Sequence, residues 1–574
     1  MRPNRQTAGG KAAVSTRRRV ALQLAGWAVL CAAAVFLVYY WRVFYSFDRF
    51  SPLGLTALAI GLVSVLYAAF WAVLHFIPTA AGRAAALLAA AGLCFCFANP
   101  PMQAPDESEH FLRAYAISLG RFDFDAERGY PDDVDLLMAC FPGAYTNGND
   151  GKPIKQYYHL ADADDPDSAK LPDGEVRSVA DCFAAYRSGL AALRQGQSPT
   201  APVRTEPIVV MLLPYLPQAL GITLARLAGF SALGCLYAGR LANLAVYVLL
   251  IWLALRGLRR WQGVFLAVAF LPLSLYMAAS LSYDALLLGL YALAAALLLR
   301  ESFTSRHLWA FAGCILLMNA AKPWINLLWI FGLLFIEKKR WQARLRPWQA
   351  VLITLAAALA FSALLTWYGR TFRHNYGELG RMLGSTVAPL QQLQFVLRNP
   401  LRTLAVLWGT LSENVFFLPG LGTFGALDTP VPAVAYLSAA LLVCGAFAEA
   451  RRRPLCARLN IGLVCFAAAY GAGVMMAMYI TYTPVGMVRV IGLQARYFLP
   501  VLTAGLLLAA QGLGLLQRRA GLTAVHHPQA SPLAADALPA LLPAGFLAAV
   551  LGALLLFETY FIGPVSWVLS EFLL

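Results

Sequence analysis

The stretch NPPMQAPDESEHFLRAY, residues 99–115, follows directly after an apolar segment and marks where that segment gives way to a polar one. Its first prolines end the apolar segment, because proline lacks a backbone N–H and restricts the residue before it. Pro105 suits the first turn of a new helix, and the carboxylates of Asp106 and Glu107 suit the positive end of its dipole. The sequence therefore predicts a helix that begins at the edge of a membrane.

Four ionisable residues of this helix fall on one face. Asp106, Glu109, His110 and Arg113 are spaced i, i+3, i+4 and i+7. Carboxylate, imidazole and guanidinium groups are then gathered at the membrane edge, as a polar substrate would require. The alternative is an ordinary capped and solvated helix, and these residues alone favour neither interpretation.

The composition excludes a soluble domain. The chain has 574 residues, of which 60% are hydrophobic and 13% charged, and its mean hydropathy is +0.63. Apolar runs near 20 residues recur, which predicts an all-α polytopic integral membrane protein. The net charge of +16 indicates membrane topology rather than nucleic-acid binding, because no nucleic-acid motif accompanies it. The ten cysteines have no metal-binding spacing.

We predict about 13 transmembrane helices. The first follows three arginines, but it is long and ends in Tyr39, Tyr40 and Trp41 without a cleavage site, so it is a retained span rather than a signal peptide. The predicted spans are 20–40, 53–77, 84–98, 234–256, 262–281, 284–300, 308–320, 323–336, 349–368, 431–449, 459–481, 496–516 and 539–560.

The lysines and arginines between these spans predict the orientation. With 13 spans their clusters all fall on the cytoplasmic side, which places the N-terminus inside and the C-terminus outside. The stretch 207–228 is apolar enough to span, but counting it would move Arg256, Arg259 and Arg260 outside. We therefore predict that 207–228 is a helix on the outer membrane surface, and we interpret 401–418 in the same way.

The loop 99–205 is extracytoplasmic in this topology and holds 17 of the 29 acidic residues. The acidic run at 161–167 is either a cation site or, as is usual for like charges, a solvated turn. Cys140 and Cys182 lie in an oxidising compartment and are a candidate disulfide. The chain thus divides into 1–98 with the N-tail and three leading spans, 99–233 with the acidic loop and surface helix, 234–368 with a helix bundle, 369–430 with a second outer loop and possible re-entrant helix, and 431–574 with the C-terminal spans.

Polar residues gather at the outer ends of the spans, where they are functional hypotheses by default. Each one alone has a structural alternative, since Lys322 could snorkel to the interface and Asp284 could cap a helix. A layer of both signs instead suits an anionic head group such as a phosphate, with a carboxylate left over as general base. The layer comprises Asp106, Glu107, His110, Arg240, Asp284, Lys322, Glu413, Asn414, Gln494, Arg496 and Tyr497.

The stretch at 99–115 resembles the signature NPPxQxPDExxHxxRAY of a bacterial membrane-protein family, the domain of unknown function 2142. Further matching pieces follow in order and extend the resemblance over about residues 95–510. They are Leu213–Gln218, Gly239–Asn243, Ser282–Asp284, Ala321–Pro323 and Gly492–Pro500. That family is similar to the C-type (GT-C) glycosyltransferases, which have many membrane helices, a large extracytoplasmic loop and polyprenyl-phosphate sugar donors.

This resemblance implies roles for the acidic pair. Asp106 is the candidate general base that deprotonates an acceptor hydroxyl, and Glu107 either supports it or binds a divalent cation; no other cofactor is implied. From charge and side of the membrane we infer that Arg240, Lys322 and Arg496 hold the donor phosphate. The other candidate substrate contacts are Glu109, His110, Arg113, Asp284, Gln494 and Tyr497.

The resulting hypothesis is a glycosyltransferase at the outer face of a bacterial inner membrane, with a polyprenyl-phosphate sugar as donor and a cell-envelope glycan or other envelope molecule as acceptor. One alternative is a transporter or flippase for a lipid-linked sugar or another anion, but few polar residues lie at the predicted midplane or inner side, which counts against it. The other alternative is a non-catalytic subunit of polysaccharide assembly. The sequence does not identify the sugar or the acceptor.

Overall fold

The computed structural model describes residues 24–36, 38–39, 51–122, 129–141, 179–197, 212–371, 387–412, 417–425, 427, 429–450, 454–520 and 532–561. These residues are mostly helical, as predicted. Their sheet consists of two short pairs: β1 (Phe303–Thr304) runs parallel to β2 (Trp341–Gln342), and β3 (Thr423–Phe424) antiparallel to β4 (Thr429–Pro430).

The chain forms two compact units, Met1–Arg83 and Ala84–Leu574. The first contains a helix at Leu24–Phe36 and α2 (Pro52–Phe76), which are joined by a hydrogen bond from Trp27 Nε1 to Ser64 Oγ of 3.0 Å. The second contains every residue of the site described below.

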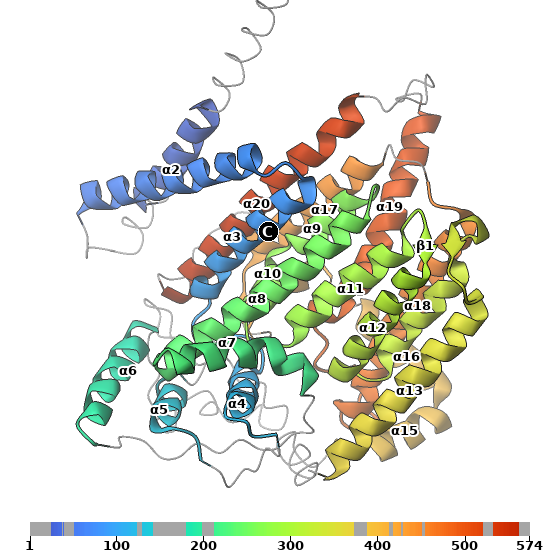
Figure 1. Ribbon diagram of the computed structural model, residues 1–574, viewed down its shortest axis with the longest axis horizontal. Coiled ribbons are helices and arrows are strands. Elements are labelled where there is room, and N and C mark those ends of the chain that lie inside the picture. Colours follow the sequence, from blue (N-terminus) through green and yellow to red (C-terminus); the bar gives the residue numbers. More distant parts are fainter. Residues whose placement is uncertain are drawn as a thin grey trace, which may run out of the picture. The chain divides into compact units, whose positions relative to one another are not determined.

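Figure 1 shows the helices of the second unit, most of which run side by side. In chain order the elements are α3 (Ala80–Ala98), α4 (Glu107–Ser118), α5 (Asp132–Cys140), α6 (Val179–Arg194), η1 (Leu213–Tyr215), α7 (Leu216–Leu227), α8 (Ala232–Gly257), α9 (Gln262–Ala269), α10 (Pro272–Ala278), α11 (Asp284–Leu298), α12 (Ser305–Ala321), η2 (Ile325–Phe335), η3 (Lys338–Arg340), α13 (Pro347–Thr371), α15 (Pro389–Arg398), α16 (Pro400–Ser412), η4 (Pro419–Gly422), α17 (Pro432–Glu449), α18 (Ala457–Thr481), η5 (Ala495–Phe498), α19 (Leu499–Arg519) and α20 (Pro532–Phe561).

Every predicted span overlaps a helix, and eight helices of the described residues are long and apolar enough to cross a membrane. The other five predicted spans are shorter or interrupted. Residues 262–281 form two helices because Pro272 begins the second one, and 323–336 form a 3₁₀ helix. The core of the second unit lies around α11, which is buried along most of its length and packs against α8, α12 and α19.

Helix α7 has the character of the predicted surface helix. Its 12 residues are too few to span a bilayer, and it packs along α8. A Cβ on Gly221 would lie 2.4 Å from the carbonyl oxygen of Ala238, so this close approach requires glycine. Its outer face carries an exposed row of leucines at Leu216, Leu220 and Leu224, which suits contact with lipid.

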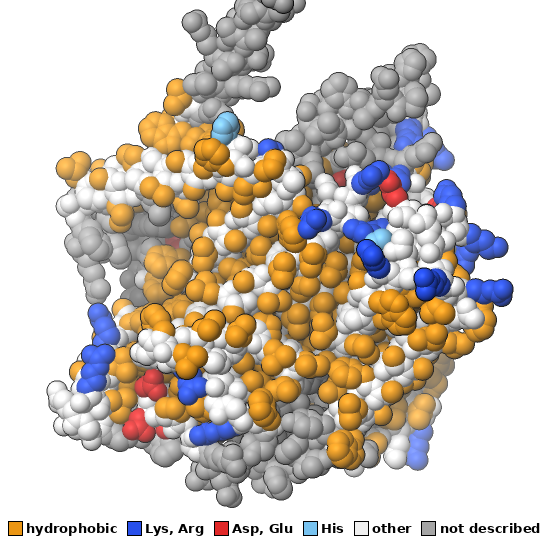
Figure 2. All heavy atoms as spheres, viewed as in Figure 1, with side chains coloured by type: hydrophobic (Ala, Val, Ile, Leu, Met, Phe, Trp, Pro, Cys, Tyr) orange, Lys and Arg blue, Asp and Glu red, His pale blue; other side chains and the backbone are white. Residues whose placement is uncertain are grey.

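The two ends of the second unit differ in what they carry. Helices α4 to α7 lie at the end opposite β1 in Figure 1. In Figure 2 hydrophobic side chains cover the helices between the two ends, most of the lysines and arginines gather around β1, and both basic and acidic side chains lie at the end that carries α4 to α7. That distribution is typical of a protein that spans a bilayer.

Candidate functional site

The segment that joins α3 to α4 has an unusual backbone. Met102 and Asp106 adopt left-handed conformations, with φ of 62° and 55°. Asp tolerates this region better than most residues, whereas Met102 is strained there. Strained residues of this kind persist where the surroundings fix them, and they cluster at functional sites.

The first anchor of this segment is a fully buried arginine. Arg240 of α8 donates Nε to Oε1 of Glu107 at 2.8 Å and Nη2 to Oε2 at 2.5 Å. Its remaining N–H groups donate to the carbonyl oxygens of Cys96 at 2.9 Å, Asn99 at 2.7 Å and Pro100 at 2.9 Å. All five guanidinium donors are therefore used. We call Arg240 and Glu107 with these carbonyls the closed centre.

The closed centre leaves no donor for a ligand. In this geometry Arg240 has no N–H for a substrate phosphate, and both oxygens of Glu107 are engaged by its guanidinium. Glu107 also accepts from the backbone N–H of Leu281 at 3.2 Å. The predicted roles of these two residues in phosphate binding, in catalysis and in holding a divalent cation with Asp106 therefore do not fit. Among the described residues no group of three His, Cys, Asp or Glu side chains is placed to hold a metal ion.

The loop before α11 is fixed by the helices around it. Asn243 of α8 donates Nδ2 to the two carbonyl oxygens that flank Leu281, each at 2.7 Å. Gln218 of α7 donates Nε2 to the carbonyl oxygen of Leu281 at 3.2 Å. These bonds and the bond to Glu107 set the position of Asp284, the first residue of α11.

Asp284 pairs with two cations at once. Its Oδ1 lies 3.0 Å from Nζ of Lys322, and its Oδ2 lies 2.9 Å from Nε of Arg496. The Arg496 N–H is not aligned with that oxygen, so the contact is an ion pair without a hydrogen bond. The other guanidinium nitrogens reach only Sδ of Met277 at 3.5 Å and Oη of Tyr497 at 3.4 Å. We call Asp284, Lys322 and Arg496 the open centre.

The open centre has two positive charges and one negative charge. The side chains of Asp284 and Arg496 are each 7% exposed, and that of Lys322 is 29% exposed. A buried guanidinium normally has acceptors for its N–H groups, because leaving a buried donor unpaired is costly. The excess of donors and of positive charge suits an anionic ligand.

Aromatic rings form a wall of the open centre. Nζ of Lys322 lies 4.3 Å from the ring centre of Tyr497 and 5.7 Å from that of Tyr283. The ring of His110 meets Tyr283 edge to face at 5.3 Å. Cations over ring faces gain an electrostatic attraction. The rings thus hold Lys322 in place and connect it with α4.

His110 is buried on α4 and is neutral. Its Nδ1 lies 2.7 Å from Oη of Tyr215, which also accepts from Nη1 of Arg113 at 3.1 Å. Burial lowers the pKa of His110 to about 3 and raises the pKa of Tyr215 to about 12. Glu109 pairs with Arg113 at 3.7 Å on the same helix. These three predicted substrate contacts therefore bind one another and Tyr215.

Asp106 is the uncommitted carboxylate of the site. It is exposed, directly precedes α4, and makes no side-chain hydrogen bond to cap that helix. Asp106 and Asp284 both act on the pKa of His110 against the effect of burial, so the three groups lie within electrostatic reach. Asp106 also acts electrostatically on Arg496, so it lies near the open centre.

Buried amides nearby lack partners. Both polar side-chain atoms of Asn99 and of Gln103 are buried without a hydrogen bond among the described residues. A small cavity of about 10 Å³ is lined by Pro105, which is two residues from Gln103 in the sequence, and by Gln494 and Arg496. Such groups are expected to bind water or a ligand, because a buried polar group without a partner is costly.

The sequence analysis missed the residues that position the predicted ones. Tyr215, Gln218, Asn243 and Tyr283 all lay within the short matching pieces, but they carry no charge and so drew no attention. Glu413, Asn414 and the acidic run at 161–167 lie outside the described residues.

Cys140 and Cys182 lie on packed helices. Both are buried, and α5 packs against α6. The residues that follow them, Phe141 and Phe183, are in ring contact at 5.0 Å. The predicted disulfide stays a prediction.

The comparisons with known proteins identify a family. A family profile described as predicted membrane protein (DUF2142) matches residues 90–504, from within α3 into α19, and so covers both centres. Neither the search of curated proteins nor the search of solved structures gave a match. The chain belongs to the DUF2142 family of predicted membrane proteins.

Proposed function

We propose that the protein is a membrane glycosyltransferase that moves a sugar from a polyprenyl-phosphate donor to a cell-envelope acceptor. The observation that supports this proposal is the open centre, in which Lys322 and Arg496 share the single carboxylate of Asp284 beside the exposed Asp106. Two cations suit a donor phosphate, and a solvated carboxylate suits a general base.

In the proposed reaction the acceptor hydroxyl attacks the anomeric carbon of the sugar while Asp106 takes its proton. The new bond joins the acceptor oxygen to the anomeric carbon, and the bond from that carbon to the phosphate oxygen breaks. The leaving polyprenyl phosphate gains the negative charge, which Lys322 and Arg496 stabilise. Attack opposite the leaving group inverts the anomeric carbon.

The proposed setting is the extracytoplasmic face of a bacterial inner membrane. The basic residues of η3 and those around β1 lie at the end of the bundle away from α4 to α7. Under the positive-inside rule that end is cytoplasmic and the open centre faces outward. The full GT-C-like topology of 13 spans would require the shorter helices α11, α12, η2 and Leu24–Phe36 and the α9–α10 pair to cross as well.

The test uses purified protein with radiolabelled polyprenyl-phosphate sugars and compares the wild type with Asp106→Asn. We expect donor turnover, including slow hydrolysis, to fall by about 10²–10⁴-fold in the variant. Asp132→Asn, an exposed carboxylate of α5, is the matched control and should keep full turnover. Full turnover in Asp106→Asn would refute its role as base. Binding without turnover in the wild type would instead favour a transporter or an assembly subunit.

A further inference from the structure

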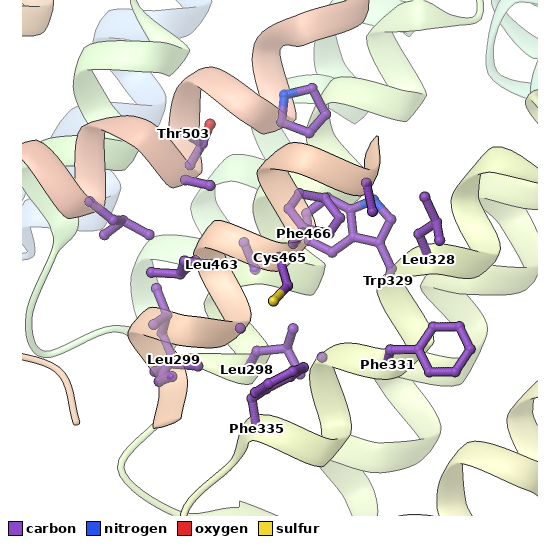
Figure 3. A pocket seen from close by; sticks show the side chains of 18 of the residues that line it. Leu298, Leu299, Leu328, Trp329, Phe331, Phe335, Leu463, Cys465, Phe466 and Thr503 are labelled. Carbon is purple, nitrogen blue, oxygen red and sulfur yellow. The ribbon is translucent and has the colours of Figure 1, made fainter. Parts of the chain in front are cut away.

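A large cavity lies among the membrane helices, away from the charged groups. Its volume is about 290 Å³, and α11, η2, α18 and α19 form its walls. The walls are almost entirely apolar, as Figure 3 shows for Leu298, Leu463, Phe335 and Phe466, and Thr503 is among the few polar residues that line the cavity. The volume is about twice that of an engineered apolar cavity of ~150 Å³ that stays dry and binds benzene.

The elements that line the cavity are the ones that carry the open centre. Asp284 begins α11, and Tyr291 and Leu298 of the cavity wall follow it on that helix. Arg496 precedes α19, whose Thr503 lines the cavity. Seven residues of helix rise by roughly 10 Å, so the cavity begins about two turns from the ion pairs. Lys322 likewise precedes η2, whose Leu328 and Trp329 line the cavity.

Aromatic side chains line the cavity on the side of the open centre. Tyr291 and Trp329 stack in parallel at 5.7 Å, and Oη of Tyr470 donates to Oη of Tyr291 at 3.0 Å. Asn326 lies 3.4 Å from Oη of Tyr470 and donates Nδ2 to the carbonyl oxygen of Lys322 at 2.8 Å. These aromatic residues are therefore connected through Asn326 to the backbone of Lys322, one of the two cations of the open centre.

Two lining residues of the cavity, one on η2 and one on α18, are exposed. Phe331 is 44% exposed, and Cys465 is exposed with its thiol directed into the space between the lining side chains (Figure 3). The wall on this side is an 11-residue 3₁₀ helix, whereas runs beyond three or four residues are uncommon and often mark a hinge. Trp324 before it has a φ of 74°, which is strained for such a residue. In a bilayer the exposed side chains of Phe331 and Cys465 would face lipid.

We propose that this cavity binds part of the hydrocarbon chain of a lipid phosphate whose phosphate group lies at Lys322 and Arg496. This inference rests on the proposed function for the identity of the head group. The chain would enter from the bilayer between η2 and α18 and pass the ring of Trp329. An apolar chain suits the walls, which offer few polar groups, and a phosphate suits the two cations.

Native cysteines provide the test. Cys465 lines the cavity, and Cys444 of α17 is also exposed but does not line it, so it serves as the internal control. The purified full-length protein is treated with N-ethylmaleimide in detergent, with and without long-chain polyprenyl phosphate, and the modified peptides are quantified by mass spectrometry. We expect the lipid to slow modification of Cys465 at least fivefold and to leave Cys444 unchanged. No protection of Cys465 at saturating lipid would overturn the proposal.

Three further probes separate the cavity from the head-group site. Inorganic phosphate and geranyl phosphate should protect Cys465 little, because neither carries a chain that fills the cavity. A neutral polyprenol should protect only at a higher concentration than the phosphate. Equal protection by the two lipids would support the cavity but contradict phosphate binding at Lys322 and Arg496. Protection of both cysteines alike would indicate detergent exchange and overturn the proposal.

A pair of neighbouring variants completes the test. Ala469→Phe adds a ring at the cavity wall, whereas Ala468→Phe adds the same ring on the exposed side of α18 outside the cavity. We expect Ala469→Phe to weaken binding of long-chain polyprenyl phosphate about tenfold and to leave binding of geranyl phosphate unchanged. Ala468→Phe should change neither. Equal effects of the two variants, or equal effects on the two lipids, would overturn the proposal.

Discussion

Two buried arginines meet carboxylates in this protein, and they differ in how many of their donors are used. Arg240 pairs with Glu107 and spends its other N–H groups on backbone carbonyls, so every donor is occupied. Arg496 shares Asp284 with Lys322 and has only long contacts besides. The charge of a buried residue therefore does not tell whether it binds a ligand. The number of donors left over does.

Removing the arginine of the closed centre is expected to have the largest effect. Arg240→Ala leaves the buried carboxylate of Glu107 without its cation and with only the backbone N–H of Leu281 as a partner, which costs about 3–5 kcal/mol of unfolding free energy. The measurement is unfolding in detergent, by heat or denaturant. The double variant Arg240→Met with Glu107→Leu should recover much of this loss, because no charge is left buried. If Arg240→Ala were as stable as the wild type, the closed centre would not have the structural role that distinguishes it from the open centre.

Removing the arginine of the open centre should affect function more than stability. Arg496→Ala is expected to lower kcat/KM for the polyprenyl-phosphate donor by about 10²–10³-fold, since it removes donors from the developing charge on the phosphate. Its loss of stability should be smaller than that of Arg240→Ala, because Lys322 still pairs with Asp284. Arg496→Lys should keep part of the activity. Full donor turnover in Arg496→Ala would show that Arg496 takes no part in donor binding or catalysis.

A third variant asks whether α4 depends on the closed centre alone. Tyr215→Phe removes the hydroxyl that binds both His110 and Arg113. The buried ring of His110 then loses its partner and Arg113 keeps only its contact with Glu109, so the expected cost is about 1–3 kcal/mol of unfolding free energy. Thermal unfolding measures it, with Tyr436→Phe on an exposed ring as control. No loss would mean that Glu107 and Arg240 suffice to hold the helix.

The smallest effect near neutral pH concerns the protonation of His110. His110 has a folded-state pKa of about 3, below the ordinary value of about 6.5 in the unfolded chain. Between these values the unfolded state binds more protons, so this contribution to stability is full above pH 6.5 and is lost as the pH falls toward 3. The slope is at most about 1.4 kcal/mol per pH unit. Comparing the pH dependence of unfolding in the wild type and His110→Gln measures it, and identical profiles would contradict the assignment.

The sequence places Asp284, Lys322 and Arg496 in one polar layer with Arg240 and Glu107, but it does not divide that layer into the two centres. Asp284, Lys322 and Arg496 each lie at the outer end of a predicted span. Counting the spans is therefore enough to place the three residues on the same side of the membrane. Arg240 has the same signature, and its role depends on carbonyls that the prolines after α3 turn toward it. Sequence patterns carry no information on where carbonyls point.

Helix number shows a similar limit. Length and hydropathy are enough to predict spans that each overlap a helix of the structure, because apolar runs bounded by turns are visible in the sequence. They do not reveal that 323–336 adopts a 3₁₀ helix or that Pro272 divides another segment in two.

The pairing of Glu107 with Arg240 also has a consequence for how the chain is made. The two residues are separated by 133 positions, which include most of the acidic loop and all of α7. A ribosome delivers Glu107 long before its partner, so the strained segment at 99–106 cannot be locked until α8 has been inserted into the bilayer. During this interval Glu107 is an unneutralised carboxylate at the membrane edge. The segment that carries Asp106 can therefore take its final form only after Arg240 of α8 is in place.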